Sequence, residues 1–141
     1  MCVFIISGVN VSMEPAEKLK MLRDLLLKQH KLLLDRERTA YERANGTITA
    51  AQYLNLIIED PAFSWLRKFS MLIVEIDEMF ALKDGFDAEM VAANLEKVQA
   101  LAAMDGIDGV DDVFWEKYGE AVASVSDVKT LDTAMWQILQ Q

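Results

Sequence analysis

Few side chains in this sequence have the chemistry that catalysis or metal binding usually requires. The chain contains one histidine, His30, and one cysteine, Cys2. These two residue types supply most general bases, nucleophiles and zinc ligands in proteins, so a Cys/His zinc site lacks ligands here. The di-iron pattern of helical bundles is also missing, because Leu27 and not glutamate stands three residues before His30. We therefore expect no metal and no cofactor.

Phosphate and calcium loops have equally little support. Neither of the common glycine-rich phosphate-binding patterns occurs in the chain. Asp105 and Glu116 have the spacing of the first and last ligands of a calcium loop, but Ile107 and Gly109 occupy two of the ligand positions between them. The segment 105–112 is better explained as a turn that leads into the next helix.

One set of ionisable side chains falls where the core is expected. On the first long helix, His30 and Glu37 share the apolar stripe that contains Leu33, and residues farther along the chain are placed to face the same region. The full set is His30, Glu37, Tyr41 and Asp77. Burial beside a charged neighbour moves the pKa of a histidine or carboxyl group into the working range of acid and base catalysts. The hypothesis is a ligand pocket or acid/base site. The alternative, which we favour, is a structural hydrogen-bond cluster or side chains at the solvent edge.

Helices must position these side chains. Pro15 suits the first position of a helix, and the leucine spacing then predicts a long helix to about Ala44, ended by Asn45-Gly46. Thirty helical residues span about 45 Å, and the apolar stripe along them needs other helices to cover it.

Two further helices are predicted to meet at a sharp corner. Thr49 and Gln52 have capping-box spacing, which starts a helix over residues 50–59. A residue before proline avoids helical geometry, so Asp60 ends that helix and caps the next one. The next helix extends from about Pro61 to Leu82, with an apolar arc wide enough to be covered on two sides.

The rest of the chain continues the helical pattern. The turn Asp84-Gly85 and the cap Asp87 start a helix that reaches about Met104. A helix around Trp115 and a last helix capped by Ser126 follow. Because short connections favour antiparallel neighbours, we predict an all-α antiparallel bundle of five to six helices with one long N-terminal helix.

We predict a single domain over residues 15–141, preceded by an apolar tail over residues 1–14. A short strand and extra residues from an upstream start codon are the alternatives for MCVFIISGVNV. The tail has no basic stretch of the kind that begins a signal peptide, and no run reaches the roughly 18 apolar residues of a membrane span. One cysteine forms no disulfide within the chain, which is typical of a reducing compartment. We expect a cytoplasmic protein outside the membrane.

The charge of the chain is strongly negative and unevenly distributed. The net charge is −9, with +2 over residues 1–48 and −11 over residues 49–141. Nucleic acid is bound largely through cations that neutralise its phosphates. We therefore expect no nucleic-acid partner.

Four separated runs carry a resemblance to a known family. They are HKLLLDRER at 30–38, YER at 41–43, DPAFSWL at 60–66 and LIVEIDE at 72–78. From about Leu19 to the C-terminus, the chain resembles an uncharacterised family of small helical proteins from Gram-negative bacteria, a domain of unknown function. The resemblance implies a helical, cytoplasmic, bacterial protein and transfers no active residue. The N-terminal MCVFIISGVNV departs from the family pattern.

These observations favour a non-enzymatic helical bundle that binds another protein or itself. Catalytic residues are scarce, whereas three tryptophans and eight methionines exceed what a small core needs. The wide apolar arcs lead us to expect a homodimer, with a monomer that buries them internally as the alternative. The second functional hypothesis is a small-molecule-binding or enzymatic bundle that uses the polar set around His30.

Overall fold

The computed structural model describes residues 13–103 and 112–141. Every regular element in these ranges is a helix, which confirms the all-α prediction. The elements are α1 (Pro15–Asn45), α2 (Ala50–Glu59), the 3-10 helix η1 (Pro61–Leu66), α3 (Arg67–Phe80), α4 (Ala88–Ala102), α5 (Asp112–Ser124) and α6 (Ser126–Leu139). The predictions for the tail up to residue 12, for Cys2 and for the turn at 105–111 lie outside the described residues.

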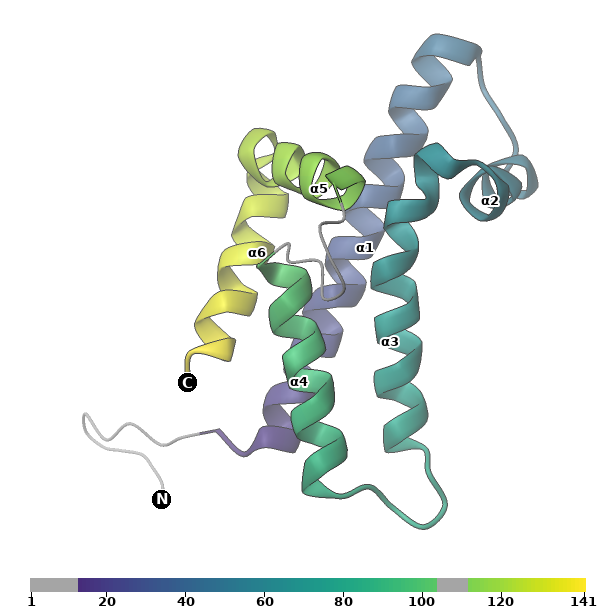
Figure 1. The fold of residues 1–141 in the computed structure, drawn as a ribbon. Helices are drawn as coiled ribbons and strands as arrows, with labels where there is room; N and C mark the ends of the chain where they lie inside the picture. Colours follow the sequence, from purple (N-terminus) through teal and green to yellow (C-terminus); the bar gives the residue numbers. More distant parts are fainter. Residues whose placement is uncertain (1–12, 104–111) are drawn as a thin grey trace.

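Four helices form the bundle, and α1 is the longest of them. It packs against α3, α4 and α6, while α4 also packs against α3 and α6. Figure 1 shows these four helices side by side, α5 crossing the first turns of α6, and α2 standing apart from the others. Lys18 Nζ donates a hydrogen bond to the carbonyl oxygen of Gln141 at 2.7 Å, so the start of α1 lies beside the end of α6.

Several helix boundaries are set by the residues that the sequence indicates. Gly46 follows α1 with a positive φ of 91°, a conformation that glycine adopts without strain. At the start of α2, the Gln52 N–H donates to Thr49 Oγ1 at 3.1 Å and the Thr49 N–H donates to Gln52 Oε1 at 2.8 Å. Asp60 Oδ1 accepts from the Ala62 N–H at 2.9 Å. The predicted capping box and the cap after α2 are therefore confirmed.

The predicted helix over 61–82 is divided in the structure. Its first part is the 3-10 helix η1, and regular α-helical geometry begins only at Arg67. The Phe63 N–H donates to the Asp60 carbonyl oxygen at 3.0 Å, which closes a three-residue turn. A 3-10 helix aligns residues three apart, and both Phe63 and Leu66 are buried. The chain thus turns the corner and fills the core in the same six residues.

The prediction that Ser126 caps the last helix is wrong. Ser126 is the first residue of α6, and Val125 precedes it in an extended conformation. Val125 offers its carbonyl oxygen to the Lys129 N–H at 3.0 Å, but its side chain makes no capping hydrogen bond. The start of α6 is held instead by the buried contacts described below.

The core lies between the four bundle helices and continues under η1 and α5. Its largest fully buried side chains are Tyr118, Phe69, Leu19, Leu22, Leu26, Leu33, Leu66, Ile76, Met135, Gln29 and Val98. Gln29 is the amide in this otherwise apolar or aromatic set. None of the described helices is long and apolar enough to cross a membrane.

Candidate functional site

His30 lies at the edge of the core. Its ring is half-buried and stacks on Phe69 of α3, with the ring centroids 6.1 Å apart and the planes 15° from parallel. Burial lowers the pKa of His30, and no carboxylate contributes to that shift. A histidine that is hard to charge and rests on an aromatic ring is an element of packing.

Asp77 faces solvent and is paired with a cation of α1. Arg23 Nε donates to Asp77 Oδ1 and Arg23 Nη2 donates to Asp77 Oδ2, both at 2.9 Å. Arg23 precedes His30 by seven residues, which is about 10 Å along a helix. The carboxylate of Asp77 is therefore about two turns from the imidazole of His30. A partly exposed pair of this kind stabilises a fold by about 1 kcal/mol or less.

Glu37 and Tyr41 lie toward the other end of α1. Glu37 Oε2 accepts from Arg36 Nη1 at 3.3 Å, and the ring of Tyr41 meets the edge of Phe63 with centroids 6.1 Å apart. Glu37 is two turns beyond His30, in the direction opposite to Asp77. Among the described residues, no hydrogen bond, ion pair or ring contact joins any two members of the predicted set. The structure does not bring the four residues together.

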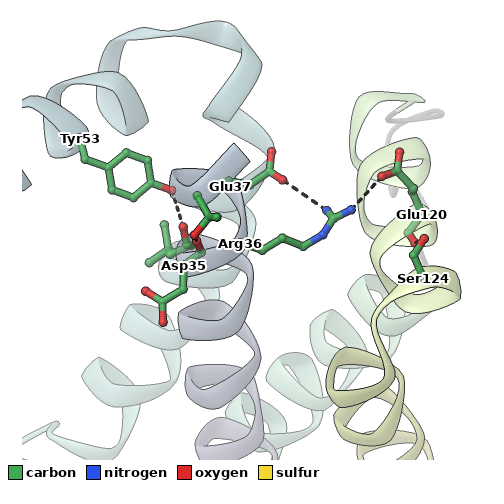
Figure 2. A network of polar contacts seen from close by, with 8 residues as sticks. Asp35, Arg36, Glu37, Tyr53, Glu120 and Ser124 are labelled. Atoms are coloured by element: carbon green, nitrogen blue, oxygen red, sulfur yellow. Dashed lines mark hydrogen bonds and ion pairs between the residues drawn. The ribbon is translucent and has the colours of Figure 1, made fainter. Parts of the chain in front are cut away.

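Arg36 and the two carboxylates that it contacts, Glu37 and Glu120, line a cleft between α1 and α5. Figure 2 shows the Arg36 guanidinium extending between Glu37 and Glu120, whose Oε1 accepts from Nη2 at 2.9 Å. The cleft measures about 540 Å³ and is lined by Asp35, Arg36, Glu37, Thr39, Ala40, Arg43, Lys117 and Glu120. Three cations and three carboxylates balance one another in this lining. The arrangement therefore favours an ion-paired junction between two helices over a site for a charged ligand.

The buried polar group of this bundle is built on Gln29. Gln29 Nε2 donates to Tyr118 Oη and to the Val128 carbonyl oxygen, both at 2.9 Å, and Tyr118 Oη donates to Asp132 Oδ1 at 2.8 Å. Gln29 and Tyr118 expose no surface, and Asp132 exposes 8%. We call these three side chains with the Val128 carbonyl the Gln29 junction. It ties α5 and α6 to the middle of α1.

The direction of each hydrogen bond in the Gln29 junction is fixed. Tyr118 has one proton and gives it to Asp132, so its oxygen must accept from the Gln29 amide. Burial raises the pKa of the Asp132 carboxyl, and the hydrogen bond from Tyr118 opposes part of that rise. Burial, and then the carboxylate of Asp132, raise the pKa of Tyr118 and keep its phenol protonated. The carboxyl group is thus stabilised by a neutral donor.

Burial also prevents the Gln29 junction from acting on a substrate. A phenol with a raised pKa stays protonated at neutral pH and so does not act as a base, and Tyr118 has no surface for a reactant to reach. Among the described residues, Gln29 Oε1 and Trp65 Nε1 are buried without a hydrogen-bond partner. Such groups cost stability and are retained where surrounding contacts compensate. We interpret the junction as structural.

Sequence reasoning missed Gln29 by one position. Gln29 stands three residues after Leu26 and four before Leu33, whereas His30 stands four after and three before the same leucines. Both spacings fit a helical stripe. His30 was predicted to be the buried polar residue because its imidazole can titrate. The signal that was available is an uncharged polar side chain on a leucine stripe. The partners Tyr118 and Asp132 lie far along the chain, and no local pattern connects them to α1.

The surface presents a second anomaly, which lies in α2. Seven of its ten residues are apolar, yet Tyr53 is the one residue of α2 that is buried. Leu54 is 56% exposed and Ile58 is 54% exposed. The exposed large apolar side chains of the described residues are Met21, Leu27, Leu54, Ile58, Met71, Val74, Leu82, Phe86, Met90, Val113 and Trp115. In α2, the exposed apolar side chains Leu54 and Ile58 lie one turn apart on the same face.

Tyr53 anchors α2 to the bundle, and Leu56 and Ile57 also pack against the core. Its hydroxyl donates to the Leu34 carbonyl oxygen at 2.6 Å, and its ring meets the edge of Phe63 with centroids 5.9 Å apart. Figure 2 shows this tyrosine pointing at the backbone of α1. Burial raises the pKa of Tyr53 to about 12. The guanidinium of Arg38 lies 5.7 Å from the ring centroid and also donates to the Ile48 carbonyl oxygen at 2.8 Å. One face of α2 is therefore fixed, and the other is free.

Two findings complete the description of the site. Within residues 13–103 and 112–141, no group of three or more His, Cys, Asp or Glu side chains is arranged to hold a metal ion. Comparison of the chain with protein-family models, with curated proteins and with solved structures finds no match.

Proposed function

We propose that this chain is a non-enzymatic helical bundle that works by binding another protein chain, or a second copy of itself, through α2. The observation that carries the proposal is the mismatch between the composition and the burial of α2. Its apolar residues form a wide arc beside the polar face of Gln52, Asn55 and Glu59. Only part of that arc is buried, and Leu54 and Ile58 are left exposed. The apolar stripe of a surface helix normally faces a core.

Energetics support a partner for this helix. Fully burying a leucine or isoleucine side chain contributes about 1.5 to 3 kcal/mol, so the half-exposed Leu54 and Ile58 leave a substantial part of that gain unused. A ten-residue helix is also marginal by itself in water. Covering Leu54 and Ile58 would stabilise α2 and the complex together.

The alternative function, a small-molecule-binding or enzymatic bundle around His30, has less support. The nearest relevant space is the cleft beside Glu37, whose volume suits a small ligand but whose lining contains equal numbers of cations and carboxylates, with Arg36 paired to both Glu37 and Glu120. His30 and Asp77 do not line that cleft. We therefore place the protein-binding function first.

We also propose a bacterial, cytoplasmic setting for this function. The support is the resemblance of the runs at 30–38, 60–66 and 72–78 to an uncharacterised bacterial family, together with a single cysteine in the chain. A homodimer is one form that the proposed binding takes. The experiment below separates it from binding to a different protein.

The test compares two variants that lose exposed apolar surface on different helices. One carries Leu54→Ser and Ile58→Ser on α2, and the matched control carries Met71→Ser and Val74→Ser on α3. All four side chains are more than half exposed. Affinity capture from the host extract with mass spectrometry, and light scattering of the purified chain, measure partner binding and self-association.

We expect wild type and the α3 control to share a captured protein, or a dimer mass, that the α2 variant loses. Circular dichroism at 222 nm should be the same for all three, because the substituted positions face solvent. If the α2 variant keeps every partner and the same mass as wild type, the proposal is wrong. A loss in the α3 control alone would move the binding surface to α3.

A further inference from the structure

The exposed side of α2 is divided into an aliphatic half and a polar half. Leu54 and Ile58 lie one turn apart on the aliphatic half. Asn55 and Glu59, each one residue later, form a parallel line beside them and turn toward a groove. Because the two lines are adjacent, one segment laid along α2 can contact both.

The groove runs between α2, the end of α1 and the start of η1. It measures about 570 Å³ and is lined by Tyr41, Ile48, Gln52, Asn55, Leu56, Glu59, Asp60 and Pro61. Its lining combines aliphatic and aromatic side chains with two amides, and its two carboxylates belong to the consecutive residues Glu59 and Asp60. The groove therefore offers apolar contacts together with concentrated negative charge.

Residues 44–66 supply no cation to this groove, although Arg38 of α1 donates a hydrogen bond to the carbonyl oxygen of Ile48 in its lining. The sequence from Ala44 to Leu66 contains neither lysine nor arginine. The last turn of α2 also lacks a basic residue, although the carbonyl end of a helix favours a cation. One oxygen of Asp60 caps Ala62, and among the described residues no ion pair is recorded for Glu59 or Asp60. A cation brought from outside would meet two carboxylates and the helix terminus together.

We infer that the segment that docks on α2 is a stretch of another polypeptide that carries aliphatic residues on one face and lysine or arginine beside them. Its aliphatic side chains cover Leu54 and Ile58, and a cation lies beside Glu59 and Asp60. The inference rests on the proposed function and names the chemistry of its partner.

The same charges argue against a second copy on this surface. In a two-fold dimer each patch meets the same patch of its partner. Two copies of the Glu59–Asp60 pair would then approach each other without a lysine or arginine from residues 44–66, in a chain of net charge −9. A basic partner avoids that repulsion and gains attraction.

The test uses two labelled helical peptides of equal length and leucine content, one with lysine and one with glutamate at the polar positions. Fluorescence anisotropy at low salt measures their binding to the full chain. We expect the Leu/Lys peptide to bind and the Leu/Glu peptide to fail. Leu54→Ser with Ile58→Ser should abolish binding of the Leu/Lys peptide.

Charge-neutralising variants then test whether a lysine of the bound peptide lies beside Glu59 and Asp60. Glu59→Gln with Asp60→Asn should weaken the Leu/Lys peptide about three- to tenfold, the range expected for two exposed charge contacts. Asparagine caps a helix as well as aspartate does, so η1 should keep its start. The matched control is Glu78→Gln with Glu96→Gln, which removes the same charge from exposed positions of α3 and α4 and should leave affinity unchanged.

Each alternative result overturns the inference. Equal binding of both peptides would show that charge does not select the partner, while the proposed function of α2 would stand if captured proteins still depend on Leu54 and Ile58. If both charge-neutralising variants weaken binding of the Leu/Lys peptide equally, the net charge of the chain and not a local contact at Glu59 and Asp60 would explain the effect. A dimer in light scattering that is lost only with Leu54→Ser and Ile58→Ser would identify a second copy as the occupant.

Discussion

The Gln29 junction and α2 differ in which kind of side chain they bury and which they expose. In the junction, polar groups that prefer water are enclosed completely, and Gln29 and Tyr118 expose no surface. In α2, side chains that avoid water are displayed, with more than half of Leu54 and of Ile58 exposed. Each region breaks the usual rule of burial in its own direction.

The difference separates stability from recognition. Buried polar groups are tolerated when they are hydrogen-bonded, and here they specify how α5 and α6 sit on α1. Exposed apolar groups give an isolated chain no such benefit, and they mark surfaces that other molecules cover. Variants of the two regions should therefore affect different measurements.

The largest loss of stability is expected for Tyr118→Ala. The change opens a cavity in the core and removes a partner from both Gln29 and Asp132, so unfolding in urea should be easier by about 3 to 5 kcal/mol. Tyr118→Phe keeps the ring and should cost about 1 to 3 kcal/mol. Equal stability of Tyr118→Phe and wild type would show that the hydroxyl contributes nothing to the fold.

Asp132 should give the Gln29 junction a distinctive pH dependence. Its folded-state pKa is raised by burial, so the folded chain holds this proton more tightly than the unfolded chain does. Stability from this group is therefore complete below the unfolded value of about 3.9 and is lost as pH rises through the folded value. Asp132→Asn keeps an acceptor for Tyr118 but cannot titrate.

Urea unfolding across acidic pH measures the difference between wild type and Asp132→Asn. Wild type should lose stability relative to the variant as pH rises, and the difference should be constant at higher pH. A parallel pair of curves at every pH would mean that the carboxyl group is not effectively buried.

His30→Ala should cost less, about 1 to 2 kcal/mol at pH 8, because the ring is half-buried against Phe69. Burial lowers the folded-state pKa of His30, so its contribution is complete above the unfolded value of about 6.5 and is lost as pH falls through the folded value. The cost of His30→Ala should shrink below pH 6.5 in urea unfolding. A cost that grows at low pH would require a carboxylate partner for the imidazole.

The smallest loss of stability is expected for Leu54→Ser with Ile58→Ser. Both side chains face solvent in the free chain, so thermal or urea unfolding should change by about 0.5 kcal/mol or less. A loss above about 2 kcal/mol would mean that these residues support the fold, and the contrast with the Gln29 junction would disappear.

Local sequence rules predicted the helices better than the contacts between them. The capping box at Thr49, the cap at Asp60 and the stop at Gly46 depend on residues three or four apart, and such signals are readable in a sequence. The 3-10 turn of η1 was missed because it depends on how Phe63 and Leu66 are buried. A pattern of apolar residues does not distinguish that turn from an α-helix.

Neither the Gln29 junction nor the exposure of α2 could be predicted from the sequence, and the reasons differ. The stripe of α1 admits both Gln29 and His30, and the choice is made by Tyr118 and Asp132 from the opposite end of the chain. The sequence of α2 has a wide apolar arc opposite Gln52, Asn55 and Glu59, which predicts burial of the whole arc. Its exposure becomes visible only when the bundle is seen to cover one side.

The most direct measurement of the role of α2 is site-specific photo-crosslinking in living host cells. A benzophenone side chain is placed at Ile58, and at Glu96 of α4 as the exposed control. The account predicts that position 58 yields a discrete adduct of higher mass that Leu54→Ser suppresses, whereas position 96 yields none. No adduct at position 58, or the same adduct at both positions, would contradict the claim that α2 is displayed for a partner.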